Sequence, residues 1–336
     1  MSILVTGGAG YIGSHTVIEL LNKNYDVIVI DDFSNSKPDI IDKIKTITGK
    51  DFKFYEINCL DKTSLENVFK ENSIDAVIHF AGFKAVGESV EKPLDYYTNN
   101  LAGSLALLNI MKKYNVKKII FSSTAVVYGI PETVQLTEEN KTGNTTNPYA
   151  TSKFFVEKVL QDLYKSDNSW DICILRYFNP IGSHESGLIG EEPNGIPNNL
   201  MPYIVRVASG ELDELSVFGN DYNTPDGTGI RDYIHVVDLA KGHIKALEKV
   251  NKENSGVFIY NLGTGKGYSV LEIIETFERV TGQKIKYKIV GRRPGDLAEY
   301  FANPQKAREE LDWNAEKTLE DMCMDSWNYI KNRNKL

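Results

Sequence analysis

A glycine-rich turn near the N-terminus constrains the fold of this chain more than any other feature of its sequence. The turn, Gly7-Gly8-Ala9-Gly10-Tyr11-Ile12-Gly13, follows the apolar run of residues 2–6, which reads as a buried strand. Residues 11–21 come next, and their apolar side chains recur with helical periodicity. A strand, a glycine turn and a helix in this order are typical of a dinucleotide-binding βαβ unit.

The three spaced glycines of this turn have separate physical roles. Gly7 permits the tight turn, Gly10 lets the backbone approach a pyrophosphate, and Gly13 lets the helix pack close to the strand. The N-terminus of the helix also attracts the negative charge of a phosphate. The turn therefore predicts a bound dinucleotide.

Two acidic residues indicate which dinucleotide is bound. Residues 26–30 read as a second strand, which ends at Asp31 and Asp32. A carboxylate at this place accepts hydrogen bonds from the adenosine ribose diol and repels a 2′-phosphate. The pair predicts NAD rather than NADP.

The rest of the first half continues the alternation of strands and helices. Strand-like runs occupy residues 52–57, 74–80, 116–122 and 171–177, and long helices are expected over residues 93–114 and 148–164. This pattern predicts a Rossmann-type α/β fold with a doubly wound parallel sheet. We assign residues 1–178 to the NAD-binding domain. Residues 179–336 form a smaller C-terminal α/β substrate lobe, with some segments returning to the first domain.

Composition excludes several classes of partner. The 336 residues carry a net charge of −8, which argues against nucleic acid or an anionic membrane surface. No leader segment and no apolar run of membrane-spanning length are evident, and the three cysteines are scattered, so the cytoplasm is the expected compartment. The histidines show no metal-ligand spacing, so no metal is predicted; they are His15, His79, His184, His235 and His243.

A tyrosine and a lysine supply candidate proton-transfer chemistry. Tyr149 and Lys153 are four residues apart, so they share one face of the helix expected over residues 148–164. A free tyrosine, with a pKa near ~10, is a poor base at neutral pH. A nearby ammonium group stabilises the phenolate and lowers its pKa, as a general base requires. Thr124, at the end of the preceding strand, can hydrogen-bond the same substrate hydroxyl.

Long stretches of the chain resemble the extended short-chain dehydrogenase/reductase family, and within it the branch of 4-epimerases that act on UDP-glucose and UDP-galactose. The resemblance covers nearly the whole length. It is carried by VIHFAGFKAVGES at residues 77–89, LRYFNP at 175–180, GIPNNLMPY at 195–203, DGTGIRDYIH at 226–235 and YNLG at 260–263.

The resemblance implies an isomerase with tightly bound NAD. Tyr149 would take the proton of the sugar 4-hydroxyl while C4 gives up a hydride, the bound 4-keto sugar would turn over, and the same hydride would return to the opposite face. Lys153 would also hold the nicotinamide ribose. The resemblance further implies a homodimer, formed by the helices expected over residues 93–114 and 148–164.

The resemblance also assigns binding residues. Those implied for NAD are Gly7, Gly10, Tyr11, Ile12, Gly13, Asp31, Asp32, Asn35, Ser36, Asn58, Cys59, Phe80, Ala81, Gly82, Lys84, Asn99, Ser122, Tyr149, Lys153, Tyr177 and Phe178. Those implied for the UDP-sugar are Lys84, Thr124, Tyr149, Phe178, Asn179, Asn199, Leu200, Phe218, Arg231, Tyr233, Arg293, Asp296 and Tyr300. Arginine pairs well with phosphate oxygens, so Arg231 and Arg293 fit a diphosphate despite the negative net charge.

Five positions limit or sharpen these expectations. Asn58-Cys59 stands where the family usually has an aspartate and an aliphatic residue against adenine, which weakens the expected contact. The related 4,6-dehydratases need acidic residues directly after Thr124, whereas this chain has Ala125 and Val126. The bulky Tyr300 favours plain hexoses over N-acetylated ones. Epimerases of UDP-N-acetylglucosamine or UDP-glucuronate remain alternatives, as does a non-catalytic nucleotide sensor of the same fold.

Overall fold

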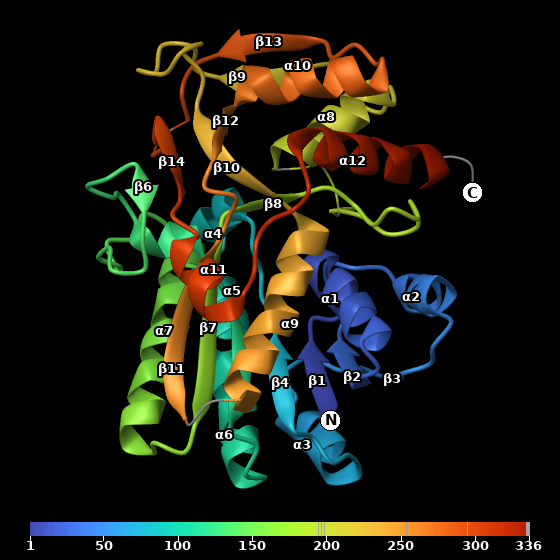
Figure 1. Ribbon diagram of the computed structural model, residues 1–336, viewed down its shortest axis with the longest axis vertical. Coiled ribbons are helices and arrows are strands. Elements are labelled where there is room, and N and C mark those ends of the chain that lie inside the picture. The colour runs from blue at the N-terminus through green and yellow to red at the C-terminus, as the bar shows by residue number, and fades with distance from the viewer. Residues whose placement is uncertain (194, 196, 198, 253–254, 294, 334–336) are drawn as a thin grey trace.

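A seven-stranded parallel sheet forms the centre of the larger half of the molecule (Figure 1). The computed structural model describes residues 1–193, 195, 197, 199–252, 255–293 and 295–333. The strands lie in the order β11-β7-β5-β4-β1-β2-β3. Their bounds are β1 Ser2–Thr6, β2 Asp26–Asp31, β3 Lys53–Glu56, β4 Ala76–His79, β5 Lys118–Thr124, β7 Asp171–Tyr177 and β11 Gly256–Leu262. The order reverses at β1 and β4, and the predicted doubly wound Rossmann-type fold is confirmed.

Successive side chains along the strands point to opposite faces of the sheet, and a layer of helices covers each face. Ile3 and Val5 face a core formed with α1 (Tyr11–Asn22), α2 (Ile40–Thr48), α9 (Val236–Lys252) and α11 (Gln305–Leu311). Leu4 faces the opposite core, formed with α3 (Lys62–Glu71), α6 (Gly103–Lys113) and α7 (Pro148–Ser166). Because both faces are covered, the strands read as continuous apolar runs rather than as alternating ones.

The helix expected over residues 93–114 is interrupted. It consists of α5 (Pro93–Tyr96), a π-helical segment η1 (Tyr97–Ala102) and α6. Asn100 is buried in the π-helical segment. Its side-chain oxygen accepts from the Phe83 nitrogen, and its amide nitrogen donates to the Phe83 carbonyl oxygen and to the Ser152 hydroxyl, both at 3.0 Å. Such wide turns re-aim side chains at functional sites. Here the turn carries Asn99, which faces the groove described below.

The second lobe lies across the carboxyl edge of the central sheet (Figure 1). Its five-stranded sheet consists of β12 (Gly267–Ser269), β10 (Ile230–His235), β14 (Glu299–Ala302), β6 (Gln135–Leu136) and β8 (Asn179–Ile181). A two-stranded sheet pairs β9 (Leu215–Phe218) with β13 (Tyr287–Val290). Three helices share its core: α8 (Leu200–Ala208), α10 (Val270–Thr281) and α12 (Leu319–Arg333). Two short helices complete the list: α4 (Val86–Glu91) lies between β4 and α5, and η2 (Ala125–Tyr128) lies between β5 and β6.

Within the described residues, no helix is both long enough and apolar enough to cross a membrane. Residues 334–336 of the predicted substrate lobe, and Ile196 and Asn198 of the GIPNNLMPY stretch, lie outside the described residues.

Candidate active site and nucleotide groove

A groove of about 1510 Å³, counted with its open mouth, runs along the carboxyl edge of the central sheet. The glycine turn and the ends of several strands form its floor, as expected at the switch point of such a sheet. The groove is lined by every residue that the sequence assigned to NAD except Phe178: Gly7, Gly10, Tyr11, Ile12, Gly13, Asp31, Asp32, Asn35, Ser36, Asn58, Cys59, Phe80, Ala81, Gly82, Lys84, Asn99, Ser122, Tyr149, Lys153 and Tyr177.

The glycine turn tests whether the groove fits a dinucleotide. A Cβ on Gly13 would lie 2.1 Å from the Gly7 carbonyl oxygen, and a Cβ on Gly10 would lie 3.2 Å from the same atom. Gly7 has a φ of +67°, and a Cβ there would lie 2.7 Å from the Ala81 nitrogen. No side chain caps the N-terminus of α1. The turn therefore presents bare backbone and an uncapped helix end, and both suit a pyrophosphate.

The two aspartates at the end of β2 differ in their surroundings. The Asp31 carboxylate accepts hydrogen bonds from the Ala9 nitrogen at 3.0 Å, the Phe33 nitrogen at 2.9 Å and the Ser36 hydroxyl at 2.9 Å. It therefore ties the glycine turn to β2. Asp32 is half-buried and accepts a hydrogen bond from the Asn58 side-chain amide at 2.6 Å. Burial raises the pKa of Asp32, but hydrogen bonds from Ser34 and Asn58 outweigh it and hold the pKa low.

Asn58 thus orients the acid that follows β2 in the groove. Its side-chain oxygen accepts from the Leu60 nitrogen at 2.8 Å, and its amide nitrogen donates to Asp32. The expected contact of Asn58 with adenine stays a prediction. Cys59 is buried, and burial raises the pKa of its thiol to about 12, so the thiol stays protonated.

The candidate proton-transfer residues meet where β5 ends and α7 begins. The Asn147 side chain accepts a hydrogen bond from the Ala150 nitrogen at 2.9 Å, and Pro148 follows it, so α7 starts one residue before Tyr149. Thr124 is the last residue of β5, and its side chain lies near enough to Tyr149 to lower the pKa of that phenol.

The electrostatics of the pair differ from the expectation. The Lys153 ammonium donates to the Ser122 carbonyl oxygen at 2.8 Å, and burial lowers its pKa to about 8. Burial raises the pKa of Tyr149 to about 12, with the Thr124 side chain opposing the rise. Because desolvation dominates and the ammonium bonds a carbonyl oxygen, the protein alone keeps the phenol protonated.

Two arginines of the second lobe gather around one carboxylate. The Arg293 guanidinium lies 4.8 Å from the ring centre of Phe218, and the Arg231 guanidinium lies 4.6 Å from that of Tyr300. The Asp296 carboxylate accepts from the Arg293 Nε at 2.8 Å and lies 4.0 Å from Arg231. The aromatic rings and the Asp296 carboxylate therefore hold the two guanidinium groups in place, and two such groups suit the binding of a diphosphate.

The remaining residues assigned to the UDP-sugar are held by the sheet and helix ends. Tyr233 is buried in β10 beside this arginine cluster, and burial raises its pKa to about 12. Asn179, in β8, pairs with Tyr233. Asn199 precedes α8, which begins at Leu200. Phe178 does not line the groove. It packs against Tyr300, with 6.2 Å between the centres of the two rings.

The groove also contains residues that the sequence did not single out. Glu191 pairs with Lys84 at 2.7 Å and accepts from the Asn199 amide at 3.0 Å. Glu192 contacts Lys37 and accepts from the Tyr329 hydroxyl at 2.6 Å. These four partners come from separate parts of the chain, so no local motif marks them.

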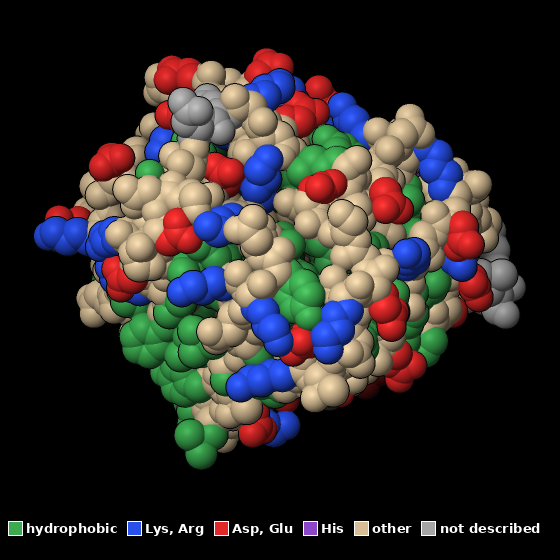
Figure 2. Space-filling model, turned by 90° about the horizontal axis from the view of Figure 1, so that it is seen from below, with side chains coloured by type: hydrophobic (Ala, Val, Ile, Leu, Met, Phe, Trp, Pro, Cys, Tyr) green, Lys and Arg blue, Asp and Glu red, His purple; other side chains and the backbone are tan. Residues whose placement is uncertain are grey.

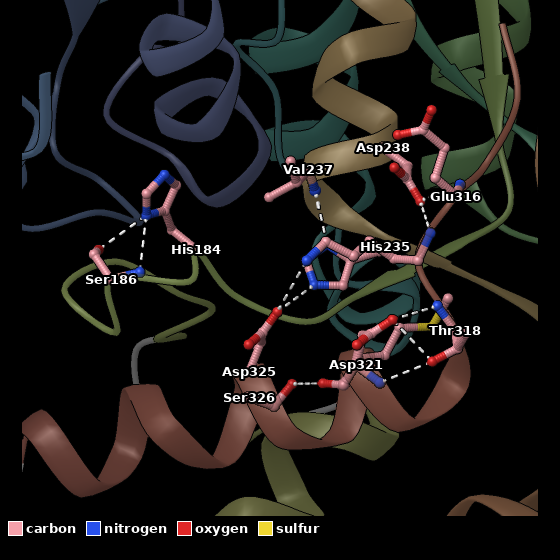
Figure 3. Close-up of polar contacts among 12 residues, drawn as sticks. His184, Ser186, His235, Val237, Asp238, Glu316, Thr318, Asp321, Asp325 and Ser326 are labelled. Carbon is pink, nitrogen blue, oxygen red and sulfur yellow. Dashed lines mark hydrogen bonds and ion pairs between the residues drawn. The ribbon is translucent and has the colours of Figure 1, made fainter.

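The histidines take part in structural contacts. His235 lies 3.2 Å from the Asp325 carboxylate and accepts from the Val237 nitrogen at 3.1 Å, where β10 gives way to α9 (Figure 3). His184 bonds Ser186 within one loop (Figure 3). Over the described part of the chain, no group of three or more His, Cys, Asp or Glu side chains is placed to hold a metal ion.

Comparisons with known proteins agree with this geometry. Residues 4–326 match the family model described as GDP-mannose 4,6 dehydratase. UDP-glucose 4-epimerase of Bacillus subtilis is 59% identical over 98% of this chain and 96% of that protein, and the Homo sapiens enzyme of that name is 56% identical over 98% and 96%.

Solved structures give the same result. The UDP-glucose 4-epimerase of Bifidobacterium longum in complex with NAD+ and UDP is 57% identical, with a TM-score of 0.96 over 100% of both chains. The Stenotrophomonas maltophila enzyme, with bound NAD and formylated UDP-arabinopyranose, is 45% identical, with a TM-score of 0.97 over 100% of this chain and 99% of that one. The chain belongs to the extended short-chain dehydrogenase/reductase family and, within it, to the UDP-glucose 4-epimerase family.

Proposed function

We propose that this protein interconverts UDP-galactose and UDP-glucose by inverting the configuration of the sugar at C4. The observation that carries the proposal is the placement of Tyr149, with Lys153, in the same groove as the glycine turn. A proton-transfer group and a dinucleotide-binding turn in one groove can act together on the same sugar carbon. The names of the relatives support this substrate pair.

The chain's own residues move and hold the proton. Bound NAD supplies a hydride acceptor and, when oxidised, a positive charge that favours the phenolate of Tyr149. Tyr149 takes the proton of the 4-hydroxyl and later returns it. Thr124 hydrogen-bonds the same region, and Lys153, with a pKa near 8, keeps most of its positive charge at neutral pH.

The second lobe holds the nucleotide while the sugar turns. Arg231 and Arg293 bind the diphosphate, and Phe218, Tyr233, Asn179, Asn199, Leu200 and Asp296 complete the site. The 4-keto sugar rotates about this handle within the closed site, so C4 presents its other face. We assign cofactor binding mainly to residues 1–178 and substrate binding mainly to residues 179–336, with β11 returning to the large sheet.

Two positions argue for epimerisation of a plain hexose. Ala125 and Val126, which follow Thr124 at the start of η2, cannot move a proton, so the acid-dependent elimination of a 4,6-dehydratase lacks its groups. Tyr300 is held between Phe178 and Arg231 and occupies space that an N-acetyl group would need.

We further propose a cytoplasmic homodimer. Large apolar side chains are exposed on α4, α5, α6 and α7: Val90 by 62%, Leu94 by 77%, Leu105 by 38% and Phe155 by 42%. Figure 2 shows hydrophobic side chains gathered at the lower left of the underside. Such a patch suits a second copy of the chain. Light scattering should give a dimer mass for the parent and a monomer mass for Leu94→Lys.

Proton NMR of the purified protein with UDP-galactose and no added nucleotide tests the reaction. The anomeric signal of UDP-glucose should appear with the parent and not with Tyr149→Phe. Turnover only with added NAD would contradict tight cofactor binding. Turnover only of UDP-N-acetylgalactosamine or UDP-glucuronate would assign another UDP-sugar. No turnover of any of these sugars would favour a nucleotide sensor.

A further inference from the structure

A buried ion pair lies behind the proton-transfer residues. Arg176 in β7 donates from its Nε to Glu157 in α7 at 3.1 Å and from its Nη2 to the other carboxylate oxygen at 2.7 Å. The two side chains are 3% and 1% exposed. A bidentate pair so deeply buried has a large desolvation cost, and removing one partner leaves an uncompensated charge.

Three successive residues of β5 each interact with α7. The Ser122 carbonyl oxygen accepts from Lys153 at 2.8 Å, the Ser123 hydroxyl donates to Glu157, and the Thr124 side chain lies near enough to Tyr149 to lower its pKa. The three helix residues are spaced by four, so they share one face of α7. Glu157 is thus the last, along α7, of the three helix residues that connect the helix to the strand end.

The pair also joins more distant elements. Arg176 donates to the Tyr128 hydroxyl at 3.0 Å, and its guanidinium lies 4.9 Å from the centre of that ring. Tyr128 in turn donates to the Asn261 side chain of β11 at 2.7 Å. Hydrogen bonds and charge from Glu157 outweigh burial and raise the pKa of Arg176 above its usual range, so Arg176 stays charged. Arg176, Tyr128 and β11 therefore hold Glu157 in place on the side away from β5.

We propose that Glu157, held by Arg176, is a positioning residue for the proposed epimerisation: it fixes the Ser122–Thr124 strand end against α7. Neither residue lines the groove in the described structure. Their action is therefore indirect, through Ser123 and Lys153. The proposal rests on the proposed function, because it assigns a role within that reaction.

The charges around Lys153 give the direction of the effect. Glu157 raises the pKa of Lys153 against the lowering by burial. From β4, His79 faces Lys153 and stays neutral, since burial and the Lys153 charge lower its pKa to about 3. Tyr177 of β7 and Tyr96 near Tyr149 have raised pKa values, so both stay neutral over the neutral range. Tyr300 also lies near Tyr149. Among the described residues, Glu157 therefore supplies the charge that raises the pKa of Lys153, and Arg176 is the counter-charge paired with Glu157.

The first experiment is a pH profile of kcat for Glu157→Gln. Loss of the carboxylate charge lowers the pKa of Lys153, so the lysine loses its proton at a lower pH. The basic limb of the profile should move down by about one pH unit. Glu66→Gln, which removes a carboxylate from a surface cluster with Lys113, should leave both the profile and kcat unchanged.

Two further variants keep the test informative if Glu157→Gln does not fold. Glu157→Gln/Arg176→Met removes both charges, so the basic limb should return toward that of the parent, while kcat stays about tenfold reduced because the strand end is less well placed. Ser123→Ala, which removes one connection and no charge, should lower kcat severalfold without moving the profile. The Kd for UDP should be unchanged in each.

The outcomes separate this proposal from the proposed function. An active parent with inactive Tyr149→Phe supports epimerisation, whatever Glu157 does. Given that activity, an unmoved basic limb in a folded Glu157→Gln variant, or a double variant with parental kcat, would overturn the positioning role. An equal loss of kcat and UDP affinity in the double variant would show a general structural defect and would also overturn it.

Discussion

The two halves of the site are built in different ways. The groove in the larger half is shaped by backbone, with Gly7, Gly10 and Gly13 placed where a Cβ would collide with main-chain atoms or crowd them. The arginine cluster of the second lobe is shaped by side chains, and the Arg293 side chain is 52% exposed. A rigid backbone cradle suits a cofactor that stays bound. Two guanidinium groups held by rings and by Asp296, with that of Arg293 exposed, suit a nucleotide that must leave after each turnover.

The largest effect should come from filling the backbone cradle. In Gly13→Ala the new Cβ would lie 2.1 Å from the Gly7 oxygen, so the turn must move, and we expect loss of bound NAD and of all activity. The NAD released per chain on denaturation measures this. Gly87→Ala is the matched control, because a Cβ there meets no atom within 4 Å. A parental NAD content in Gly13→Ala would contradict the backbone account.

Removal of the Tyr149 hydroxyl should have the next largest effect. Tyr149→Phe should lower kcat by about 10²–10⁴-fold, since general acid-base catalysis contributes that much. Bound NAD and UDP affinity should persist, because the cradle and the arginines are untouched. Tyr55→Phe on β3, whose hydroxyl bonds Glu71 at 3.2 Å, serves as control. A normal kcat in Tyr149→Phe would assign the proton to another group.

A smaller effect should come from the side-chain half. Arg231→Met and Arg293→Met should each weaken UDP binding by about 10–100-fold, as expected for lost charge-assisted hydrogen bonds. Calorimetry with UDP measures this, and NAD content should not change. Arg279→Met, which breaks an exposed pair with Glu320, is the control. Loss of NAD from either arginine variant would show that the two halves are not separable.

The smallest effect concerns substrate choice. Tyr300→Ser makes space beside Phe178, so the ratio of kcat/KM for UDP-N-acetylglucosamine to that for UDP-glucose should rise by about 10–100-fold. Tyr287→Ser, on the exposed strand β13, should leave the ratio unchanged. An unchanged ratio in Tyr300→Ser would place the selectivity elsewhere.

The two halves also differ in how far sequence predicts them. Gly7 to Gly13, Asp31 and Thr124 could be placed because each follows a strand end, and the strand ends of a parallel sheet meet at one edge. Tyr149 and Lys153 could be paired because helix spacing is regular. These are local rules, and the structure agrees with them.

Other features depend on contacts between distant segments. The pKa of Tyr149 was expected to fall because of Lys153, but burial dominates and only the fold determines burial. The interruption of the helix after Tyr96 accompanies hydrogen bonds of Asn100 to Phe83 and Ser152, which lie in distant segments. Likewise, no local pattern could join Glu192 to Lys37 and Tyr329.

The central claim is that one hydrogen leaves C4 and returns to the same carbon while the cofactor stays bound. UDP-galactose carrying deuterium at C4, incubated with the protein and excess unlabelled NADH, tests it most directly by mass and NMR analysis of the product. The account predicts UDP-glucose with deuterium retained at C4 and no label in free NADH. Loss of the deuterium from C4, or its transfer to free nucleotide, would contradict the account.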